Sequence, residues 1–282
     1  MIPSPTETTP ASDDARRAAA LAAGAGRVLL ELRDRVDDGT FRGDDAALRT
    51  AADAASQAYL MTELARARPG DVVLSEEAPD DRRRLVADRV WIIDPLDGTR
   101  EYAERTPDGA WRDDFAVHVA LWQRGHGLTD AAVALPARGV VRCTGTPIPC
   151  TVQPISTADG RRRPVRLAVS RSRPPAFASR LALGGSVELV PLGSAGIKVM
   201  AVTDGTVDAY VHAGGQYEWD SAAPVAIALD AGMVATRLDG STLVYNQSDP
   251  WCPDLVICRP EWLGALESLL AADGLAELQA NP

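Results

Sequence analysis

Residues 91–99 read Trp-Ile-Ile-Asp-Pro-Leu-Asp-Gly-Thr, and this stretch decides how the rest of the chain is interpreted. The apolar run that ends at Ile93 is typical of a buried strand. Because Pro95 fixes φ and lacks an N–H, we expect the strand to stop there, with Asp94 and Asp97 converging at its carboxyl end. Two carboxylates this close repel each other and stay ionised in a partly buried site only beside a cation. The stretch therefore predicts divalent metal ions that hold a phosphate, with an ordinary turn as the alternative.

Other acidic residues occupy positions that suit the same site. Glu76 and Glu77 directly follow a predicted strand over residues 72–75, and Asp220 stands at the start of a predicted helix. Asp53 lies on the small, alanine-rich face of an earlier helix. Taken singly, these residues have ordinary interpretations: a solvated turn, a helix cap and an exposed helical aspartate.

Composition narrows the class of protein and its partners. The chain has 282 residues, 46% hydrophobic and 24% charged, which is typical of a soluble globular protein with one large or two packed domains. Its net charge of −10 is opposite to the basic face that nucleic-acid binding requires, whereas a small phosphorylated molecule suits a site where metals supply positive charge. We expect no nucleic-acid partner.

Targeting signals and metal-binding spacings of other kinds are absent from the sequence. Residues 1–11 lack the basic and apolar regions of a signal peptide, and no apolar run is long enough for a membrane span. We therefore expect a cytoplasmic protein with no membrane partner. The four cysteines and three histidines show no zinc-ligand spacing, so we expect no zinc site and reduced cysteines. His118 lies in a predicted strand without a serine or cysteine partner, so we expect a structural role for it.

Hydrophobic periodicity predicts two long helices and several strands, followed by a half in which strands and helices alternate. The elements expected in the first half cover residues 12–36, 45–67, 72–75, 90–94, 115–122 and 131–143. Those of the second half cover residues 165–170, 187–190, 195–203, 207–212, 219–231, 255–258 and 261–272, with a further helix after residue 175. We expect a disordered tail over residues 1–11, an α+β metal-site domain over residues 12–155 and an α/β substrate domain over residues 156–282.

The order of these acidic motifs, ending in Trp219-Asp220, resembles the lithium-sensitive, magnesium-dependent phosphatase superfamily of inositol monophosphatases and bisphosphate nucleotidases. The resemblance covers nearly the whole chain after the tail. It implies a layered αβαβα sandwich of the inositol monophosphatase and fructose-1,6-bisphosphatase type. It also implies two or three Mg²⁺ ions as cofactors and inhibition by Li⁺.

The resemblance further assigns metal ligands. Glu76, Asp94 and the Leu96 carbonyl would hold a first Mg²⁺. Asp94, Asp97 and Asp220 would hold a second. Both sets are made of oxygen ligands, which Mg²⁺ prefers.

Catalytic and substrate-binding roles follow from the same resemblance. Asp53 would help to position a weaker third ion through water, while Glu76 and Thr99 would orient the attacking water. Backbone amides around Gly98 and Thr99 would receive the phosphate, and Asp220 would also lie against the substrate.

The second half of the chain bears on which phosphate ester is cleaved. Ser194 precedes a predicted helix and suits an anion site, and Lys198 adds a mobile positive charge for a second phosphate. The alternative for Lys198 is an ordinary surface lysine. Inositol monophosphatases tend to carry an asparagine at this position and a glutamate where this chain has Ala213. Residues 97–102, 213–224 and 243–247 look like bacterial bisphosphate nucleotidases of the CysQ type.

This resemblance implies 3′-phosphoadenosine 5′-phosphate as the substrate, cleaved at its 3′-phosphate to give AMP. Tyr245 either borders the adenine or is a half-buried strand tyrosine. The arginines between Arg161 and Arg173 either bind the 5′-phosphate or, as in most such runs, form a solvated loop. Rival functions are an inositol-1-phosphate or fructose-1,6-bisphosphate phosphatase and a non-catalytic metal- or nucleotide-binding module. The expected state is a monomer or a homodimer.

Overall fold

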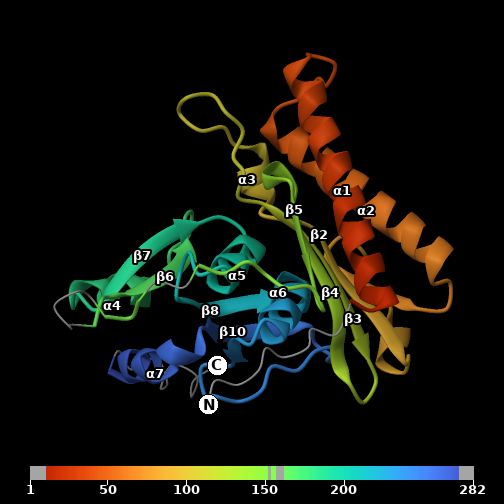
Figure 1. The fold of residues 1–282 in the computed structure, drawn as a ribbon. Helices are drawn as coiled ribbons and strands as arrows, with labels where there is room; N and C mark the ends of the chain where they lie inside the picture. The colour runs from red at the N-terminus through yellow and green to blue at the C-terminus, as the bar shows by residue number, and fades with distance from the viewer. Residues whose placement is uncertain (1–10, 152–153, 157–161, 273–282) are drawn as a thin grey trace.

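The computed structural model describes residues 11–151, 154–156 and 162–272 (Figure 1). Most of the tail expected over residues 1–11 lies outside these ranges, and so does Arg161. Two five-stranded sheets and their helices account for the described fold.

The first two layers come from the first half of the chain. Two long helices form the outer layer: α1 (Asp13–Asp37) and α2 (Asp45–Ala67). They cover one face of a sheet with the order β1-β2-β3-β4-β5, in which only β1 and β2 pair in parallel. Its strands are β1 (Val72–Ser75), β2 (Arg89–Asp97), β3 (Ala116–Gln123), β4 (Gly127–Leu135) and β5 (Val140–Cys143). The short helix α3 (Thr99–Ala103) follows β2 directly.

The remaining layers come from the second half. Helices α5 (Ala195–Thr203) and α6 (Glu218–Asp230) lie between the two sheets (Figure 1). The second sheet has the order β7-β6-β8-β10-β9. Its strands are β6 (Val165–Ser170), β7 (Val187–Leu192), β8 (Ala209–Tyr217), β9 (Val234–Thr236) and β10 (Trp251–Cys258). Helices α4 (Ala176–Leu183) and α7 (Leu263–Ala272) cover its outer face. The predicted αβαβα sandwich is therefore confirmed.

Sequence explains why α6 takes the central position. Its apolar and small residues surround the helix instead of forming one stripe, and a helix of this kind must be buried on all sides. Ala222, Val225 and Ile227 pack in a core that also contains Ile92 of the first sheet and Ile257 of the second. This shared core fixes the first turn of α6, which carries Asp220, against the end of β2.

Three strands contain a proline, and one of them is β2, which does not stop at Pro95 as expected. The pairing of β2 with β3 shifts between Asp94 and Asp97, so Pro95 lies in a bulge where its missing N–H leaves no gap in the ladder. Strand β10 is irregular in the same way at Pro253. The bulge in β2 brings both aspartates to one end of the strand, as the sequence predicted.

Other boundaries also differ from the predictions. Strand β8 begins at residue 209 and continues to residue 217, five residues beyond the predicted end, and β9 was not predicted. A 3₁₀ turn over residues 260–262 precedes α7. No helix among the described residues is long and apolar enough to cross a membrane. The division of the chain into domains at residue 155 remains a prediction.

Candidate metal and phosphate site

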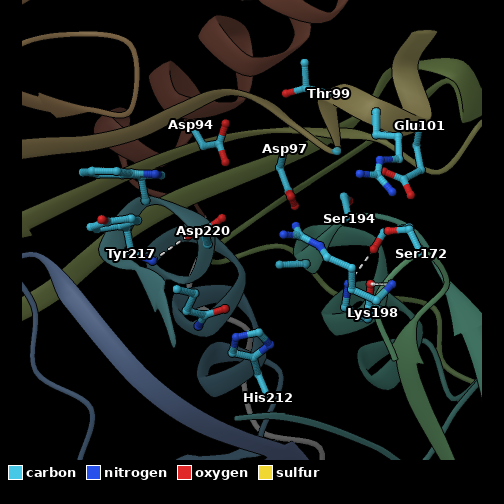
Figure 2. Close-up of a pocket in the computed structure, with 18 of the residues that line it drawn as sticks. Asp94, Asp97, Thr99, Glu101, Ser172, Ser194, Lys198, His212, Tyr217 and Asp220 are labelled. Carbon is cyan, nitrogen blue, oxygen red and sulfur yellow. Dashed lines mark hydrogen bonds between the residues drawn. The ribbon is translucent and has the colours of Figure 1, made fainter. Parts of the chain in front are cut away.

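Three carboxylates from distant parts of the chain meet at the end of the first sheet. Asp94 and Asp97 come from the bulged end of β2, and Asp220 comes from the first turn of α6. One ligand oxygen from each lies within 4.8 Å of the others (Figure 2). This distance allows a single cation, or a pair of cations, to contact all three side chains.

Asp94 has the environment of a metal ligand. It is buried, and the Leu96 amide donates to its Oδ1 over 3.0 Å, whereas its Oδ2 accepts no hydrogen bond from the described residues. Burial, and then the charges of Glu76, Asp97 and Asp220, raise the pKa of Asp94 well above its usual value. A buried carboxylate oxygen without a partner is costly, and a cation at this point removes that cost.

Asp97 is stabilised in its charged form. Burial alone would raise its pKa, but His118 and Lys198 and the Gly196 amide lower it below the usual value. His118 Nε2 lies 3.2 Å from Asp97 Oδ2, and the Gly196 amide donates to the same oxygen over 2.7 Å. The other ring nitrogen, Nδ1, lies 3.2 Å from the Trp219 carbonyl, so His118 links Asp97 on β2 to α6.

Asp220 and Glu76 complete the acidic wall. The Tyr217 amide donates to Asp220 Oδ2 over 2.6 Å, while burial and the charge of Asp97 raise the pKa of Asp220 to about 6. Glu76 follows β1 and lines the same pocket. Although its side chain is open to the pocket, the surrounding protein and then the charge of Asp220 raise the pKa of Glu76 to about 7. Glu76 therefore joins the site but lies outside the compact group of three.

Thr99 and Asp53 lie side by side behind the end of β2. Thr99 Oγ1 is 3.1 Å from the Leu96 carbonyl and 3.5 Å from Asp53 Oδ1. Partial burial and the charge of Glu77 raise the pKa of Asp53 to about 6. Thr99 and Leu96 line the pocket, whereas Asp53 reaches it only through Thr99. The structure thus brings Asp53 next to the predicted water-orienting hydroxyl.

The pocket has a volume of about 700 Å³, within the range of small-molecule sites. Gly98 lines it at a φ of +87°, and a Cβ there would lie 3.0 Å from the Cβ of Ser194. Ser194 Oγ accepts from the Ile197 amide over 3.1 Å and so caps α5. Lys198 also lines the pocket, but it is only 4% exposed and its ammonium donates to the Gly193 carbonyl over 2.5 Å. The sequence analysis predicted a mobile charge at Lys198, but in the structure this charge is fixed in place.

Tyr245 does not reach the pocket. It is 5% exposed and packs in the core between the two sheets, with its hydroxyl 3.2 Å from Ser221 Oγ. It belongs to no strand of the structure. An adenine cannot stack on a ring whose faces are covered by apolar side chains, so the proposed contact of Tyr245 with adenine is wrong for this structure.

Most of the described arginines between residues 162 and 173 are engaged with acidic partners. Arg163 and Arg166 both bond the buried Asp208, away from the pocket. Arg171 bonds Glu101 over 2.9 Å. Arg173 alone among these described arginines lines the pocket.

Several pocket residues were not found from the sequence. Arg49 lies one helical turn before Asp53 on α2. Residues at this spacing share a face of a helix, so the predicted helix could have indicated that Arg49 lies near Asp53. Tyr217 and Trp251 also line the pocket. Only the long-range pairing of β8 with β10 brings these two rings together, and no local pattern signals it.

The layered fold and the acidic site define a class of metal-dependent phosphatase folds, and comparison with known proteins identifies the family. The model of the inositol monophosphatase family matches residues 12–273. A 3′-phosphoadenosine 5′-phosphate phosphatase of Mycobacterium leprae is 51% identical over 258 residues, which cover 88% of this chain and 90% of that protein. A 3′(2′),5′-bisphosphate nucleotidase CysQ of Salmonella typhimurium is 30% identical over 80% of this chain and 91% of that protein.

Solved structures show the same fold. Mycobacterium tuberculosis SuhB is 23% identical, with a TM-score of 0.69 over 95% of this chain and 99% of that chain. The chain belongs to the inositol monophosphatase family, and the predicted resemblance is confirmed. Members of this family are generally metal-dependent, in agreement with the acidic cluster.

Proposed function

We propose that this protein is a Mg²⁺-dependent phosphomonoester hydrolase that converts 3′-phosphoadenosine 5′-phosphate to AMP and phosphate. The observation that supports it most is the group of Asp94, Asp97 and Asp220 at the floor of a pocket of about 700 Å³. Relatives that match most of the chain carry the names 3′-phosphoadenosine 5′-phosphate phosphatase and bisphosphate nucleotidase.

The residues fit the metal ions that the family implies. Asp94 offers a buried oxygen that lacks a partner, and Asp97 and Asp220 offer further oxygens within 4.8 Å. Glu76 and the Leu96 carbonyl would complete the ligands of two Mg²⁺ ions, with Asp53 beside a third. When bound, Mg²⁺ lowers the pKa of coordinated water and neutralises charge on the phosphate.

The remaining groups of the pocket would bind the substrate and orient the attacking water. Thr99 is fixed by the Leu96 carbonyl at the edge of the pocket, where its hydroxyl and the Glu76 carboxylate would orient the attacking water. The backbone around Gly98 would receive the reacting phosphate. The buried ammonium of Lys198 supplies positive charge to the same pocket and would favour a substrate with a second phosphate.

The rival activities have less support. Ala213 lines the pocket where inositol monophosphatases carry a glutamate, so it offers no carboxylate for an inositol hydroxyl. Inositol phosphates and fructose 1,6-bisphosphate would then be side substrates. Glu76 and Thr99 are both present in the pocket, which disfavours a non-catalytic module. A cytoplasmic location and a monomeric or homodimeric state remain predictions.

A substrate panel tests the proposed function. Phosphate release is measured from 3′-phosphoadenosine 5′-phosphate, inositol 1-phosphate and fructose 1,6-bisphosphate, with Mg²⁺ and with a chelator. We expect the nucleotide to have the highest kcat/KM, the chelator to abolish release, and millimolar Li⁺ to inhibit. A higher kcat/KM for a base-free substrate, or release that is indifferent to the chelator, would contradict the proposal.

A further inference from the structure

One wall of the pocket is aromatic and exposed, unlike the acidic floor. Tyr217 is 42% exposed and Trp251 is 45% exposed, and both line the pocket that contains the carboxylates. Among the described residues, they are the only aromatic side chains in the group of exposed large hydrophobics. Exposed aromatic surface inside a small-molecule pocket usually marks where an apolar part of the ligand binds.

The two rings belong to a cluster that holds them in place. Tyr217 stacks on Trp219 with ring centroids 4.7 Å apart and planes at 12°. Trp251 meets Tyr217 edge-on at 5.2 Å, because the two residues are directly paired across β8 and β10. These contacts restrict the orientation of the rings before a ligand binds, which lowers the entropy cost of binding.

The backbone leaves room for the Trp251 indole. Gly215 has a φ of +88°, and a Cβ at this position would lie 1.6 Å from Trp251 Cζ2. The indole therefore rests directly on the Gly215 backbone. Because any side chain at position 215 would displace Trp251, the glycine at this position allows the ring to line the pocket.

The cluster also adjoins the metal site. The Tyr217 amide donates to Asp220 Oδ2, so one ring of the cluster is three residues from a metal ligand and bonded to it through the backbone (Figure 2). A ligand whose phosphate lies at Asp94, Asp97 and Asp220 thus has an aromatic surface within the same pocket for the part attached to that phosphate.

We propose that Tyr217 and Trp251 form the base subsite, on which a flat purine ring stacks while its attached phosphate lies at the carboxylates. This inference rests on the proposed function and names the residues that recognise the nucleotide. Stacking on aromatic rings accepts any base because every base has a π-face, whereas a cyclitol or a sugar has none. The subsite takes the place of the contact that Tyr245 does not make.

Kinetics of Trp251→Ala test the subsite. We expect the KM for 3′-phosphoadenosine 5′-phosphate to rise about tenfold or more, which is typical for the loss of one base stack, with kcat within about twofold. The inhibition constant of inorganic phosphate, which has no base, should not change. Trp251→Phe should restore most of the affinity. The matched control is Leu229→Ala, which truncates a 51% exposed side chain outside the pocket.

Tyr217→Ala provides a second, independent variant if Trp251→Ala does not fold. An unchanged nucleotide KM in either folded variant would overturn the subsite, and so would a parallel rise in the phosphate inhibition constant, because that result indicates a disturbed metal site. Wild-type protein that releases no phosphate from the nucleotide would instead contradict the proposed function.

Discussion

Asp97 shows how a single residue can keep its charge inside the protein. Its Oδ2 is approached by the Gly196 amide and by His118, while the Asp94 carboxylate nearby has an oxygen without a partner. The site therefore combines one carboxylate that is already stabilised with another that a cation would stabilise. This asymmetry depends on close packing of α5 against β3, which only a glycine at position 196 allows.

Gly196→Ala tests this packing. A Cβ at residue 196 would lie 2.2 Å from His118 Nε2, so we expect the unfolding free energy to fall by about 1–3 kcal/mol, as in other overpacked sites. Urea unfolding measures the change. The control is Gly264→Ala in α7, where no atom lies within 4 Å and helix propensity predicts a gain of up to about 1 kcal/mol. Equal effects of the two substitutions would contradict the steric argument.

Residues of the site divide into those that local sequence predicts and those that it does not. The spacing of Asp94 and Asp97 after an apolar run predicted a shared site, and the structure places them together. Tyr245 was misplaced because a tyrosine near a strand pattern gives no information on which face is buried. Trp251 was missed because its contact with Tyr217 joins residues that are 34 positions apart and depends on strand register.

At the scale of elements, Arg33 connects the outer helix layer to the segment that carries Thr99. Arg33 is buried in α1, and its guanidinium donates to the carbonyls of Tyr102 and Arg112 over 2.9 and 2.8 Å. Burial lowers the pKa of Arg33 to about 10, so it remains charged at neutral pH. The arginine thereby fixes the end of α3 against α1.

Arg33→Met should destabilise this connection. The substitution leaves buried carbonyls without donors, so we expect a loss of about 2–4 kcal/mol in unfolding free energy and a lower kcat, because α3 carries Thr99 at its start. Chemical denaturation and phosphate release measure the two effects. Arg27→Met, on an exposed position of α1, should change stability by no more than about 0.5 kcal/mol. Wild-type stability of Arg33→Met would contradict this role.

The bounds of an element were predicted well where its hydrophobic periodicity is strong. They were predicted less well where pairing with a distant strand determines them. Helices α1 and α2 carry end signals such as the Ser12 cap, and both appear close to the predicted bounds. Strand β2 extends past Pro95 because a bulge in its pairing with β3 accommodates the proline. That bulge needs the partner strand, which the local sequence around Pro95 does not contain.

At the scale of the whole molecule, the candidate metal site lies where the first sheet meets the central helix layer. Asp94 belongs to the first sheet, Asp220 belongs to the helix between the sheets, and both halves of the chain share one core. Metal ions at this junction would link the halves. The fold class could be predicted because the order of the motifs resembles a known superfamily. The shared core could not be predicted, because it depends on how α6 packs between the sheets.

If metal ions link the two halves, the thermal stability that they add should depend on pH. Burial and the charges of neighbouring carboxylates raise the pKa of Glu76 to about 7 and of Asp220 to about 6, above the unfolded values near 4. Their contribution to metal-free stability is therefore present below about pH 4 and is lost as the pH rises through 6 to 7. The proposed Mg²⁺ ions would bind the ionised carboxylates, so their stabilising effect should grow over the same range.

We expect saturating Mg²⁺ to raise Tm by about 5 °C at pH 8.0 and by much less at pH 5.5. Differential scanning calorimetry with Mg²⁺ and with a chelator at both values measures the difference. Groups outside the site titrate equally with Mg²⁺ and with the chelator, so their effect on Tm cancels when the two are compared at one pH. Equal increases at the two pH values would show that these carboxylates do not bind the ion.

The most direct test of the metal site is a calorimetric titration of Mg²⁺ into wild-type protein and into Asp94→Asn. Asn keeps the shape of the side chain but removes the charge and one ligand oxygen, and the exposed Asp239→Asn serves as the matched control. We predict that Asp94→Asn stays folded, that its Mg²⁺ affinity falls by at least about 100-fold and that phosphate release is abolished. Asp239→Asn should behave as wild type. Unchanged Mg²⁺ affinity and turnover in folded Asp94→Asn would contradict the metal site and the hydrolase function that depends on it.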